Sequence, residues 1–402
     1  MRPFTSVISL DDARRALQSA VVPIARTERI ALDGAVGRVA ARDVASDIDV
    51  PPFARSAMDG YAVRSADTAA ASQTAPATLR ILERIYTGQM PSTAIAAGAC
   101  AEIATGAPMP AGADAVVMVE ETAAADGVRV SILADAKPGQ NVTPRGADIS
   151  RGTPIIMNGD LLSASRIGAL AAIGRTNVEV FAKPRVAILS TGNEVIEPGQ
   201  PLAPGQIYDV NRFTLAAIVS AHGGVPEPQA AVPDTIDALA AAIDGLLTAD
   251  MIVFSGGSSV GERDLILDLV AARGEMIFHG VAIKPGKPTA FARIGDKPFF
   301  GMPGNPTSCL SNAYVLLVPF LRAMARLPPY SPRTVRTALG ERIASGSGRH
   351  TFYTVRIQDS RAFPAFRGSG AITSLSQADG YIEIPADQTV VEAGTMVQVT
   401  LF

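Results

Sequence analysis

The sequence is poor in the side chains that bind transition metals. It contains two cysteines, Cys100 and Cys309, which lie far apart and form no pair with metal-ligand spacing. Its three histidines, His222, His279 and His350, are too few and too scattered to build a site from imidazoles. We therefore expect no protein-ligated zinc centre, and we interpret both cysteines as small buried hydrophobic residues.

Long hydrophobic runs and an excess of either charge are also missing. No stretch approaches the roughly 18 uninterrupted apolar residues that a membrane-spanning helix requires, and the opening segment MRPFTSVISLDDARRAL lacks the apolar run of a signal peptide. The formal net charge is -3 and the pI is about 5.7, which excludes a surface that neutralises a nucleic acid backbone along its length. We expect a cytoplasmic protein without membrane or nucleic acid partners, in which any anion site is local.

The material that is present suits a globular protein of several domains. Hydrophobic residues make up 48% of the 402 and charged residues 18%, which gives ample core and no signature of disorder. At about 150 residues per domain, this length predicts two to four domains.

The first part of the chain predicts a β-rich module set between two helices. Apolar spacing favours one helix from Leu10 to about Ile24, opened by Asp11 and Asp12, and another over 160–174, ended by Gly174. We expect these two helices to pack together as a linking domain, formed by 5–26 and 147–180. Between them, over 27–146, short apolar runs such as 77–86, 115–120 and 127–133 alternate with Gly, Pro and Asp, which is typical of short strands.

A different pattern begins at Lys183. RVAILSTGNEV is a continuous apolar run that ends in small polar residues, as buried parallel strands do. Helices over 211–221, 235–247 and 264–272 and strands over 229–232, 251–255 and 275–283 follow in alternation, and a long apolar helix spans 306–325. This order predicts a doubly wound α/β domain over 181–328. Prolines at 328, 329 and 332 separate it from a small β domain over 329–402.

Three loops of the α/β domain are candidates for a ligand site. They are Ser190–Glu194 with Gly192, Ser255–Asp264 with Gly256 and Gly257, and Gly301–Ser308 with Pro303 and Pro306. Ligands of open α/β sheets bind beyond the carboxyl ends of strands, and glycines let backbone N–H groups approach a phosphate. Glycine turns also occur for geometry alone. Together, the three loops indicate a nucleotide or another phosphorylated ligand.

Charged residues lie in or beside these loops. Glu194, Asp234 and Asp264 could gather around Mg2+, which prefers oxygen ligands; the alternative is that Asp234 and Asp264 cap helices. Lys284 and Lys287 stand on a Pro-Gly turn that suits a phosphate or an oxyanion, with solvated surface lysines as the alternative. The β-rich module adds two exposed loops, PPFARSAMDGYAV around Asp59 and ATGAPMPAGADAVV with Thr105, which ordinary turns explain equally well.

Six motifs, taken together and in order, carry a resemblance to a known family. They are SAMDGYAV, TGAPMPAGADAVV, STGNEV with PGQIYDVN, SGGSSVG, KPGKP and MPGNP. They resemble molybdopterin molybdenumtransferase, the MoeA family that includes the gephyrin E domain, and the likeness runs from about residue 5 to the end. The resemblance implies a multidomain α/β plus β fold, in which a doubly wound, MogA-like molybdopterin-binding domain accompanies a β-rich lid, a helical linking domain and a carboxy-terminal β domain.

The activity implied is Mg2+-dependent insertion of molybdate into adenylylated molybdopterin, with release of AMP. The resemblance implies a homodimer whose active-site cleft joins the α/β domain of one subunit to the β module of the other. It assigns Asp59 and Thr105 to the β-module side, and it suggests a molybdopterin adenylyltransferase as a protein partner. On the α/β side it places the metal and nucleotide near Glu194, Asp234 and Asp264, molybdate or phosphate at Lys284 and Lys287, the pterin above Pro303 and Pro306, and Ser369 in the cleft.

In three places the chain departs from the family pattern. Gly280 stands where many relatives have a lysine, next to His279, and Ala54 replaces a common aspartate. In NVTPRGADI, Thr143 and Ala147 replace an arginine and a glutamate, and Arg145 is the candidate substitute for that arginine. These changes remove charge from the expected pocket and lower the expected affinity more than they alter the reaction.

Other functions stay open at the level of sequence. The chain could be a molybdopterin-binding scaffold without turnover, which release of AMP would exclude. A nucleotidyltransferase that adenylylates molybdopterin is disfavoured, because that family resembles the α/β domain alone. A paralogue for tungstate or for another pterin would be recognised by competition between the two oxyanions.

Overall fold

The computed structural model describes residues 7–123, 126–256, 265–346 and 348–402. The chain folds into two compact units. One contains the residues up to Glu28 together with Phe181–Phe402, and the other contains Arg29–Val180. The fold class predicted from the sequence is confirmed, because an α/β sheet, a β-rich module and a carboxy-terminal β domain are all present. The four expected domain boundaries stay a prediction.

The centre of the first unit is a six-stranded mixed sheet, in which the first four strands pair in parallel and the last two pairings are antiparallel, so that only the fifth strand runs in the opposite direction. Its order is β16-β13-β17-β21-β20-β18. The strands are β13 (Arg185–Ser190), β16 (Val225–Pro228), β17 (Met251–Ser255), β18 (Gly274–His279), β20 (Ala290–Ile294) and β21 (Lys297–Met302).

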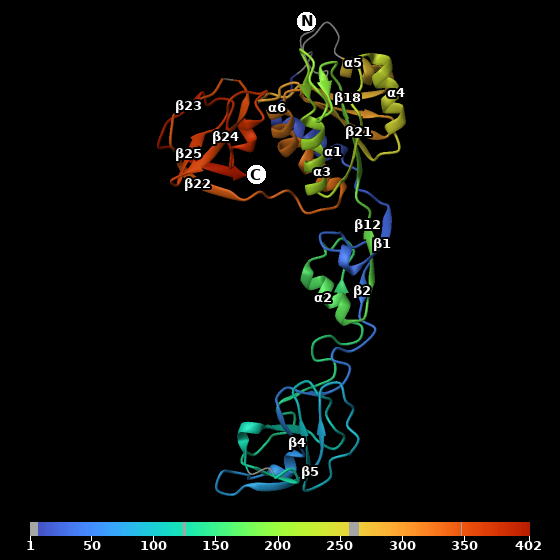
Figure 1. Cartoon of the computed structure of the whole chain (residues 1–402), viewed down its shortest axis with the longest axis vertical. Helices are drawn as coiled ribbons and strands as arrows, with labels where there is room; N and C mark the ends of the chain where they lie inside the picture. The colour runs from blue at the N-terminus through green and yellow to red at the C-terminus, as the bar shows by residue number, and fades with distance from the viewer. Residues whose placement is uncertain (1–6, 124–125, 257–264, 347) are drawn as a thin grey trace. The chain divides into compact units, whose positions relative to one another are not determined.

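Helices cover both faces of this sheet (Figure 1). Because side chains alternate along a strand, Val186 and Ile188 of β13 enter one hydrophobic core, whereas Ala187 and Leu189 enter the other. The first core is covered by α1 (Leu10–Ala20), α3 (Asn211–Ala221), α6 (Pro306–Asn312) and α7 (Val318–Met324), with a π-helical stretch over Ala313–Leu317. The second core is covered by α4 (Ile236–Leu246) and α5 (Leu265–Arg273).

The first helix does not pack where the sequence suggested. Leu10, Ala13 and Leu17 belong to the α/β core, so the expected packing of this helix on the helix of 160–174 is wrong. Its amphipathic pattern gives a buried face but does not identify the partner of that face. The helix also ends at Ala20 rather than near Ile24, because Pro23 disfavours the helical conformation of the residue before it.

Two further differences concern strands. The strand expected at 229–232 lies at Val225–Pro228, whose prolines are tolerated because β16 is an edge strand. The expected strand 275–283 is divided into β18 and the short β19 (Ile283–Lys284), and β19 pairs with the carboxy-terminal domain instead of the α/β sheet.

The carboxy-terminal domain is a closed sheet around its own core. Strand β24 pairs with both β25 and β26, which closes the order β24-β25-β22-β28-β26 into a ring. Leu339, Val355 and Ile382 are among its buried residues. The elements are β22 (Thr334–Leu339), β23 (Ile343–Ala344), β24 (His350–Gln358), β25 (Arg361–Pro364), α8 (Thr373–Ser376), β26 (Gly380–Ile384), β27 (Val390–Val391) and β28 (Met396–Leu401).

The second unit contains a six-stranded sheet of order β7-β4-β6-β5-β9-β8. Its strands confirm the short apolar runs read from the sequence: β4 (Gly60–Val63), β5 (Ala77–Ile85), β6 (Ala99–Ile103), β7 (Ala115–Met118), β8 (Thr122–Ala123) and β9 (Arg129–Ile132). Gly60 is required at the start of β4, because a Cβ there would lie 1.9 Å from the backbone oxygen of Val117.

A smaller core in the same unit surrounds α2 (Ala164–Ala172). Leu170 packs there with Leu162 and Val178, and Ser163 caps the helix by accepting a hydrogen bond from the N–H of Arg166. Gly174, with φ +77°, follows the helix as the sequence suggested. The paired short strands of this region are β1 (Thr27–Ala31) with β12 (Asn177–Phe181), β2 (Val44–Ala45) with β11 (Pro154–Ile156), and β3 (Arg55–Ser56) with β10 (Val142–Thr143).

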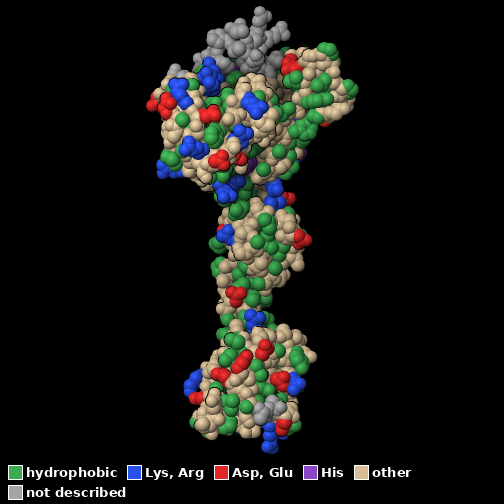
Figure 2. Space-filling view, turned by 60° about the vertical axis from the view of Figure 1, so that its left-hand side comes forward, with side chains coloured by type: hydrophobic (Ala, Val, Ile, Leu, Met, Phe, Trp, Pro, Cys, Tyr) green, Lys and Arg blue, Asp and Glu red, His purple; other side chains and the backbone are tan. Residues whose placement is uncertain are grey.

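Surface charges follow the composition. On the face of the molecule that Figure 2 shows, lysine and arginine are interspersed with aspartate and glutamate, as a net charge of -3 suggests. Among the described residues, no helix has the length and hydropathy needed to cross a bilayer.

Candidate functional site

The strand-end loops of the α/β sheet meet at one edge. Ser190, at the end of β13, lies in register with Ser255 of β17, which in turn lies in register with Met302 of β21. These strands are parallel, so the segments that follow them leave the sheet side by side. This confirms that the three glycine-containing loops singled out in the sequence begin at the same place.

Glycine brings two of these loops into close contact. The N–H of Thr191 donates to the backbone oxygen of Ser255 at 3.0 Å. Gly256 has φ +120°, and a Cβ at this position would lie 2.5 Å from the backbone oxygen of Thr191. Any other residue would push the loops apart, so this glycine has a packing role as well as a conformational one.

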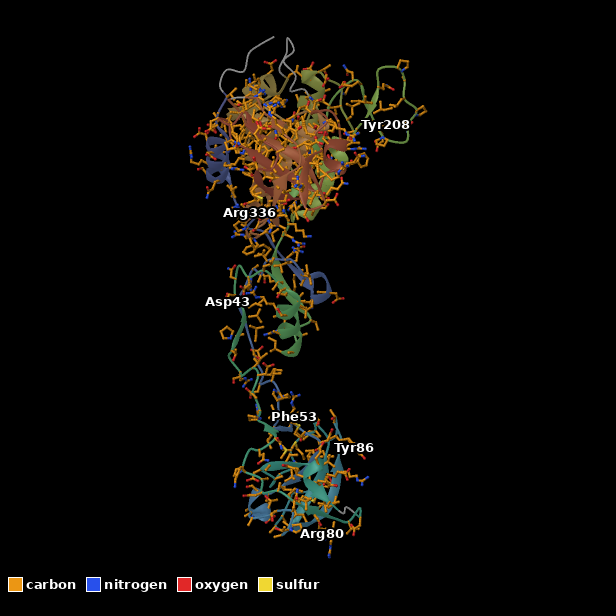
Figure 3. All side chains as sticks on the ribbon, turned by 90° about the vertical axis from the view of Figure 1, so that its left-hand side faces the viewer. Asp43, Phe53, Arg80, Tyr86, Tyr208 and Arg336 are labelled. Atoms are coloured by element: carbon orange, nitrogen blue, oxygen red, sulfur yellow. The ribbon has the colours of Figure 1, made fainter. Side chains whose placement is uncertain are left out.

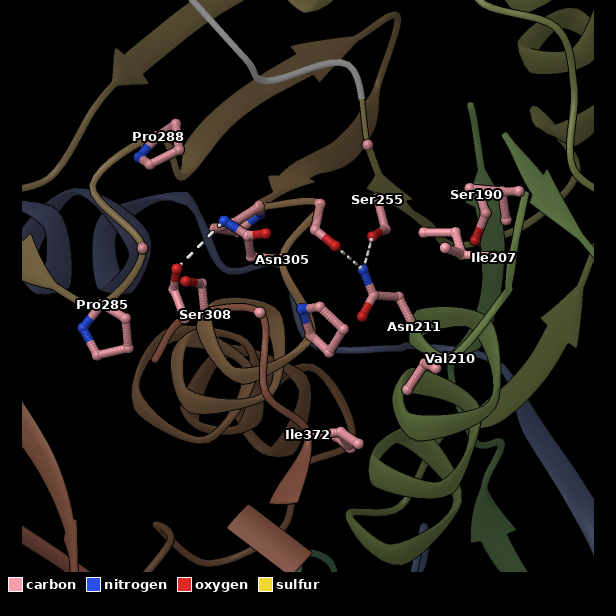
Figure 4. Close-up of a pocket in the computed structure, with 18 of the residues that line it drawn as sticks. Ser190, Ile207, Val210, Asn211, Ser255, Pro285, Pro288, Asn305, Ser308 and Ile372 are labelled. Carbon is pink, nitrogen blue, oxygen red and sulfur yellow. Dashed lines mark hydrogen bonds between the residues drawn. The ribbon is translucent and has the colours of Figure 1, made fainter. Parts of the chain in front are cut away.

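Asn211, the first residue of α3, connects the loops across the sheet edge. Its side-chain nitrogen donates to Ser255 Oγ at 2.7 Å and to the backbone oxygen of Gly304 at 2.8 Å, as the dashed lines in Figure 4 show. Cys309 Sγ lies 4.0 Å from the same Ser255 oxygen. Burial raises the pKa of the Cys309 thiol to about 12, so this sulfur remains protonated and unreactive.

The KPGKP turn is held from beneath by a second asparagine. Asn312 of α6 is fully buried, and its side-chain nitrogen donates to the backbone oxygen of Gly286 at 2.8 Å and to Thr289 Oγ1 at 2.5 Å. Gly286 has φ +97°. Strand β19, which carries Lys284 at the start of the turn, pairs in parallel with His350 and Thr351 of β24. Both the α/β core and the carboxy-terminal domain therefore fix the turn.

The carboxy-terminal domain also reaches the start of α6. The backbone oxygen of Ser369 accepts from the N–H of Thr307 at 3.0 Å, and its hydroxyl accepts from Asn305 Nδ2 at 3.3 Å. Thr307 Oγ1 donates to the backbone oxygen of Ala371 at 2.6 Å. These bonds place Ser369 directly beside the MPGNP loop.

All these segments surround one cavity of about 1090 Å3. Its wall includes the parallel strands β14 (Val195–Ile196) and β15 (Ile207–Tyr208), and Figure 3 labels Tyr208 of β15 at the margin of the unit. The residues predicted from the sequence that line the cavity are Glu194, Asp234, Ser255, Gly256, Lys284, Lys287, Pro303, Pro306 and Ser369. Gly192 lies in the loop after β13, outside the residues that line it.

The cavity has charges of both signs. Lys284 and Lys287 are half-buried rather than fully solvated, and Arg349 from the carboxy-terminal domain lines the same space. Glu194 and Asp234 contribute carboxylates. An anion and a cation can therefore be held side by side here.

Asp234 does not have the capping role offered as the simpler alternative. The residue that caps α4 is Thr235, whose hydroxyl accepts from the N–H of Ala238. The Asp234 carboxylate instead accepts a hydrogen bond from Thr191 Oγ1. The capping interpretation is wrong for Asp234, because the helix begins one residue later than the carboxylate would need.

Two of the three expected Mg2+ ligands lie among the described residues. Glu194 and Asp234 line one cavity and offer the carboxylate oxygens that Mg2+ prefers. Asp264 and Gly257 lie outside the described residues. Within the described ranges, no group of three or more His, Cys, Asp or Glu side chains could hold a metal ion. The donor chemistry fits Mg2+ with water and substrate oxygens completing its shell, whereas the three-carboxylate set stays a prediction.

Asp59 and Thr105 are neighbours in the second unit. Asp59 Oδ1 accepts from the N–H of Thr105 at 2.7 Å, which joins the two loops singled out in the β-rich module. Asp59 also lines a separate cavity of about 240 Å3, together with Tyr61 and Tyr86. Arg145, the candidate substitute for a missing arginine, donates to Asp49 Oδ2 at 2.7 Å.

Sequence reasoning missed several residues of the large cavity. Arg349 follows no recognisable pattern, because it lies in a turn before β24 and is brought to the cavity by the pairing of β19 with β24. Asp209 and Asn211 lie in PGQIYDVN, which was noted only as a motif. The polar ending of that motif directly before a helix was the available signal. Both cysteines are buried, as predicted.

Family models match most of the chain. One describes the "MoeA N-terminal region (domain I and II)" and matches residues 8–174. A second, for a "Probable molybdopterin binding domain", matches 187–323, and a third, for the "MoeA C-terminal region (domain IV)", matches 336–402.

Curated relatives and solved structures agree with these matches. The chain is 34% identical over 398 residues to molybdopterin molybdenumtransferase 2 of Mycobacterium tuberculosis (strain H37Rv), covering 96% of this chain and 95% of the relative. It is 33% identical to the molybdopterin molybdenumtransferase of Nostoc sp., with 98% and 94% covered. One structure of a molybdopterin biosynthesis MoeA protein from Pyrococcus horikoshii has a TM-score of 0.86 at 38% identity, with 98% of this chain and 99% of that chain covered. A second such structure from the same organism has a TM-score of 0.81 at 29% identity, with 99% of this chain and 100% of that chain covered.

Proposed function

The chain belongs to the MoeA family of molybdopterin molybdenumtransferases, and from this premise we propose that it inserts molybdate into adenylylated molybdopterin with Mg2+ as helper ion and releases AMP. It is an enzyme of molybdenum cofactor biosynthesis. The observation that carries the finer proposal is the large cavity of the first unit, in which Lys284, Lys287 and Arg349 share one space with Glu194 and Asp234.

The two kinds of charge support a division of roles. Molybdate and the substrate phosphates are anions, and ammonium and guanidinium groups beside them offset charge that develops on phosphoryl oxygens. Glu194 and Asp234 would hold Mg2+, which when bound supplies further positive charge at the phosphate. We assign no covalent nucleophile, so positioning and electrostatics supply most of the rate.

Ser369 and the MPGNP loop shape the rest of the site. The hydrogen bonds from Thr307 and Asn305 hold Ser369 at the cavity wall, where its hydroxyl can orient an oxyanion. Pro303 and Pro306 give the loop a rigid apolar surface suited to a flat ring. The glycine contacts between the Thr191 and Gly256 loops support close approach of the backbone to the nucleotide.

A turnover assay tests the proposal. The purified chain, given adenylylated molybdopterin, molybdate and Mg2+, is expected to release AMP, and addition of EDTA is expected to abolish that release. Omission of molybdate is the control for simple hydrolysis. If AMP appears at the same rate without molybdate or with the metal removed, or does not appear at all, the proposal fails; complete absence with retained binding would instead indicate a scaffold.

The proposal includes a homodimer in which Asp59 and Thr105 of one copy act on the substrate bound by the other copy. Asp59 would act as a base or would orient water. Neither Asp59→Asn nor Lys284→Ala alone should then insert molybdenum efficiently. Mixed subunits should recover up to about a quarter of wild-type activity, because half of random dimers carry one intact site of two. The measurement is AMP release after the two variants are denatured together and refolded.

Three controls make this experiment specific. Each variant refolded alone shows whether refolding itself changes activity, and size-exclusion chromatography reports whether dimers form. Recovery no greater than the sum of the single variants would contradict a shared site. Full activity of Asp59→Asn alone would remove Asp59 from the mechanism.

A further inference from the structure

The wall of the large cavity contains buried oxygen atoms that lack hydrogen-bond partners among the described residues. They are Ser190 Oγ, Asp209 Oδ2 and Asn211 Oδ1, in side chains that are 3%, 5% and 7% exposed. Leaving a buried polar atom without a partner is energetically costly, and folded proteins leave few of them. Two of the three belong to one motif at the start of α3, which points to a ligand.

The orientation of the Asn211 side chain is fixed by its other contacts. Its amide nitrogen has two hydrogens, and both are used, one by Ser255 Oγ and the other by the backbone oxygen of Gly304. Rotation of the amide would break both bonds. Asn211 Oδ1 can therefore only accept, so its partner must be a donor.

Asp209 presents an acceptor that is not suited to a metal ion. Its Oδ1 accepts from the N–H of Arg212 at 3.0 Å, whereas its Oδ2 lies 3.8 Å from Arg212 Nε, too far for a hydrogen bond. The Arg212 guanidinium, which donates to Glu197, also lies beside this carboxylate, and its positive charge opposes the binding of a second cation there. Neutral N–H donors fit this oxygen better.

Two groups of residues line opposite sides of the cavity. In Figure 4, Pro285 and Pro288 of the KPGKP turn lie on one side of the view, and Asn211 and Ser190 lie on the other. The cationic side chains of the turn suit the anionic parts of a substrate. The buried acceptors of Asp209 and Asn211 suit a neutral part of the substrate that carries N–H groups.

We propose that Asp209 and Asn211 bind the pyrimidinone edge of the pterin ring, with one acceptor for the 2-amino group and the other for the adjacent ring N–H. This assignment rests on the proposed function, because it takes molybdopterin as the substrate. The amino group of adenine is the other N–H donor of that substrate. The pterin fits better because its amino and ring N–H donors are adjacent, which matches two separate acceptors, whereas the amino edge of adenine has no ring N–H donor.

Binding of neopterin, a fluorescent pterin, to the full chain tests the proposal. Asp209→Asn keeps the oxygen that Arg212 needs and replaces the other with an NH2 donor. The dissociation constant for neopterin is expected to rise about tenfold or more, because a donor would then face a donor. The dissociation constant for AMP and the melting temperature should stay unchanged. Asp237→Asn, an exposed carboxylate on α4, is the matched control and should bind both probes as the wild type does.

A change of ligand gives a second test that needs no variant. Lumazine has an oxygen where pterin has the 2-amino group, and the wild-type chain is expected to bind it about tenfold more weakly than pterin itself. The proposal is overturned if wild-type chain does not bind neopterin, if lumazine binds as tightly as pterin, or if Asp209→Asn weakens AMP but not neopterin. These measurements involve no turnover, so selective pterin binding without AMP release would leave this inference standing while the proposed function failed.

Discussion

Replacement of Lys284 by alanine is expected to lower the rate of molybdate-dependent AMP release by about 100-fold, the effect of removing one charged or hydrogen-bonding group that stabilises a developing anion. Lys284 is half-buried and lines the large cavity, so a charged side chain on the exposed surface cannot replace its charge. The measurement is the initial rate at saturating and at limiting molybdate. An increase in the KM for molybdate would show that the lysine also binds the oxyanion before reaction.

Lys297 provides the matched control. It lies at the start of β21, outside the residues that line the cavity, and pairs with Asp296 at 3.2 Å. Lys297→Ala removes the same charge from the same domain and should change the rate by less than twofold, since a surface ion pair contributes little. Equal losses in the two variants would mean that overall charge, rather than the position of Lys284, controls the reaction.

Gly286→Ala should be at least as damaging, because it moves both lysines of the turn. Gly286 has φ +97°, a conformation that L residues rarely adopt, and a Cβ there would lie 2.1 Å from Asn312 Nδ2. The turn must shift, and the buried asparagine loses hydrogen bonds to it. We expect AMP release to fall by more than the about 100-fold of a single lost lysine, together with a lower melting temperature.

Gly295→Ala separates backbone strain from the clash. Gly295 lies in the tight turn between β20 and β21 with φ +59°, and a Cβ there would meet nothing within 4 Å. This variant is expected to lose about 1 kcal/mol of stability from its backbone conformation alone and to keep its activity. Gly286→Ala with wild-type rates would show that the turn tolerates displacement and that the lysines do not need their observed positions.

Much of the first unit could be predicted from local pattern. The apolar run RVAILS predicts a buried strand, and in the structure every residue from Val186 to Ser190 is buried. Helix α3 begins and ends where its apolar spacing indicated. The pattern could not assign partners. The apolar face of α1 fits any core, and only the folded chain shows that it packs on the α/β sheet.

The candidate site shows the same limit. Glycines and charged residues at strand ends identified Gly256, Lys284 and Asp234 as lining residues, because the edge of a parallel sheet collects its loops. Arg349 comes from a different domain and depends on a long-range strand pairing that no local signal encodes. The polar ending of PGQIYDVN indicates Asp209 only weakly, whereas the buried Oδ2 without a hydrogen-bond partner among the described residues is a property of packing that the sequence does not show.

The parallel pairing of β19 with β24 has a consequence for protein engineering. Residues 283–284 belong by sequence to the α/β domain, yet they complete the sheet of the domain that follows the proline-rich linker. A chimera joined at that linker would combine a strand from one parent with a sheet from the other. A chimera of two relatives should therefore take residues 283–284 from the same parent as the carboxy-terminal domain, because these residues, rather than the linker, mark the structural boundary between the two domains.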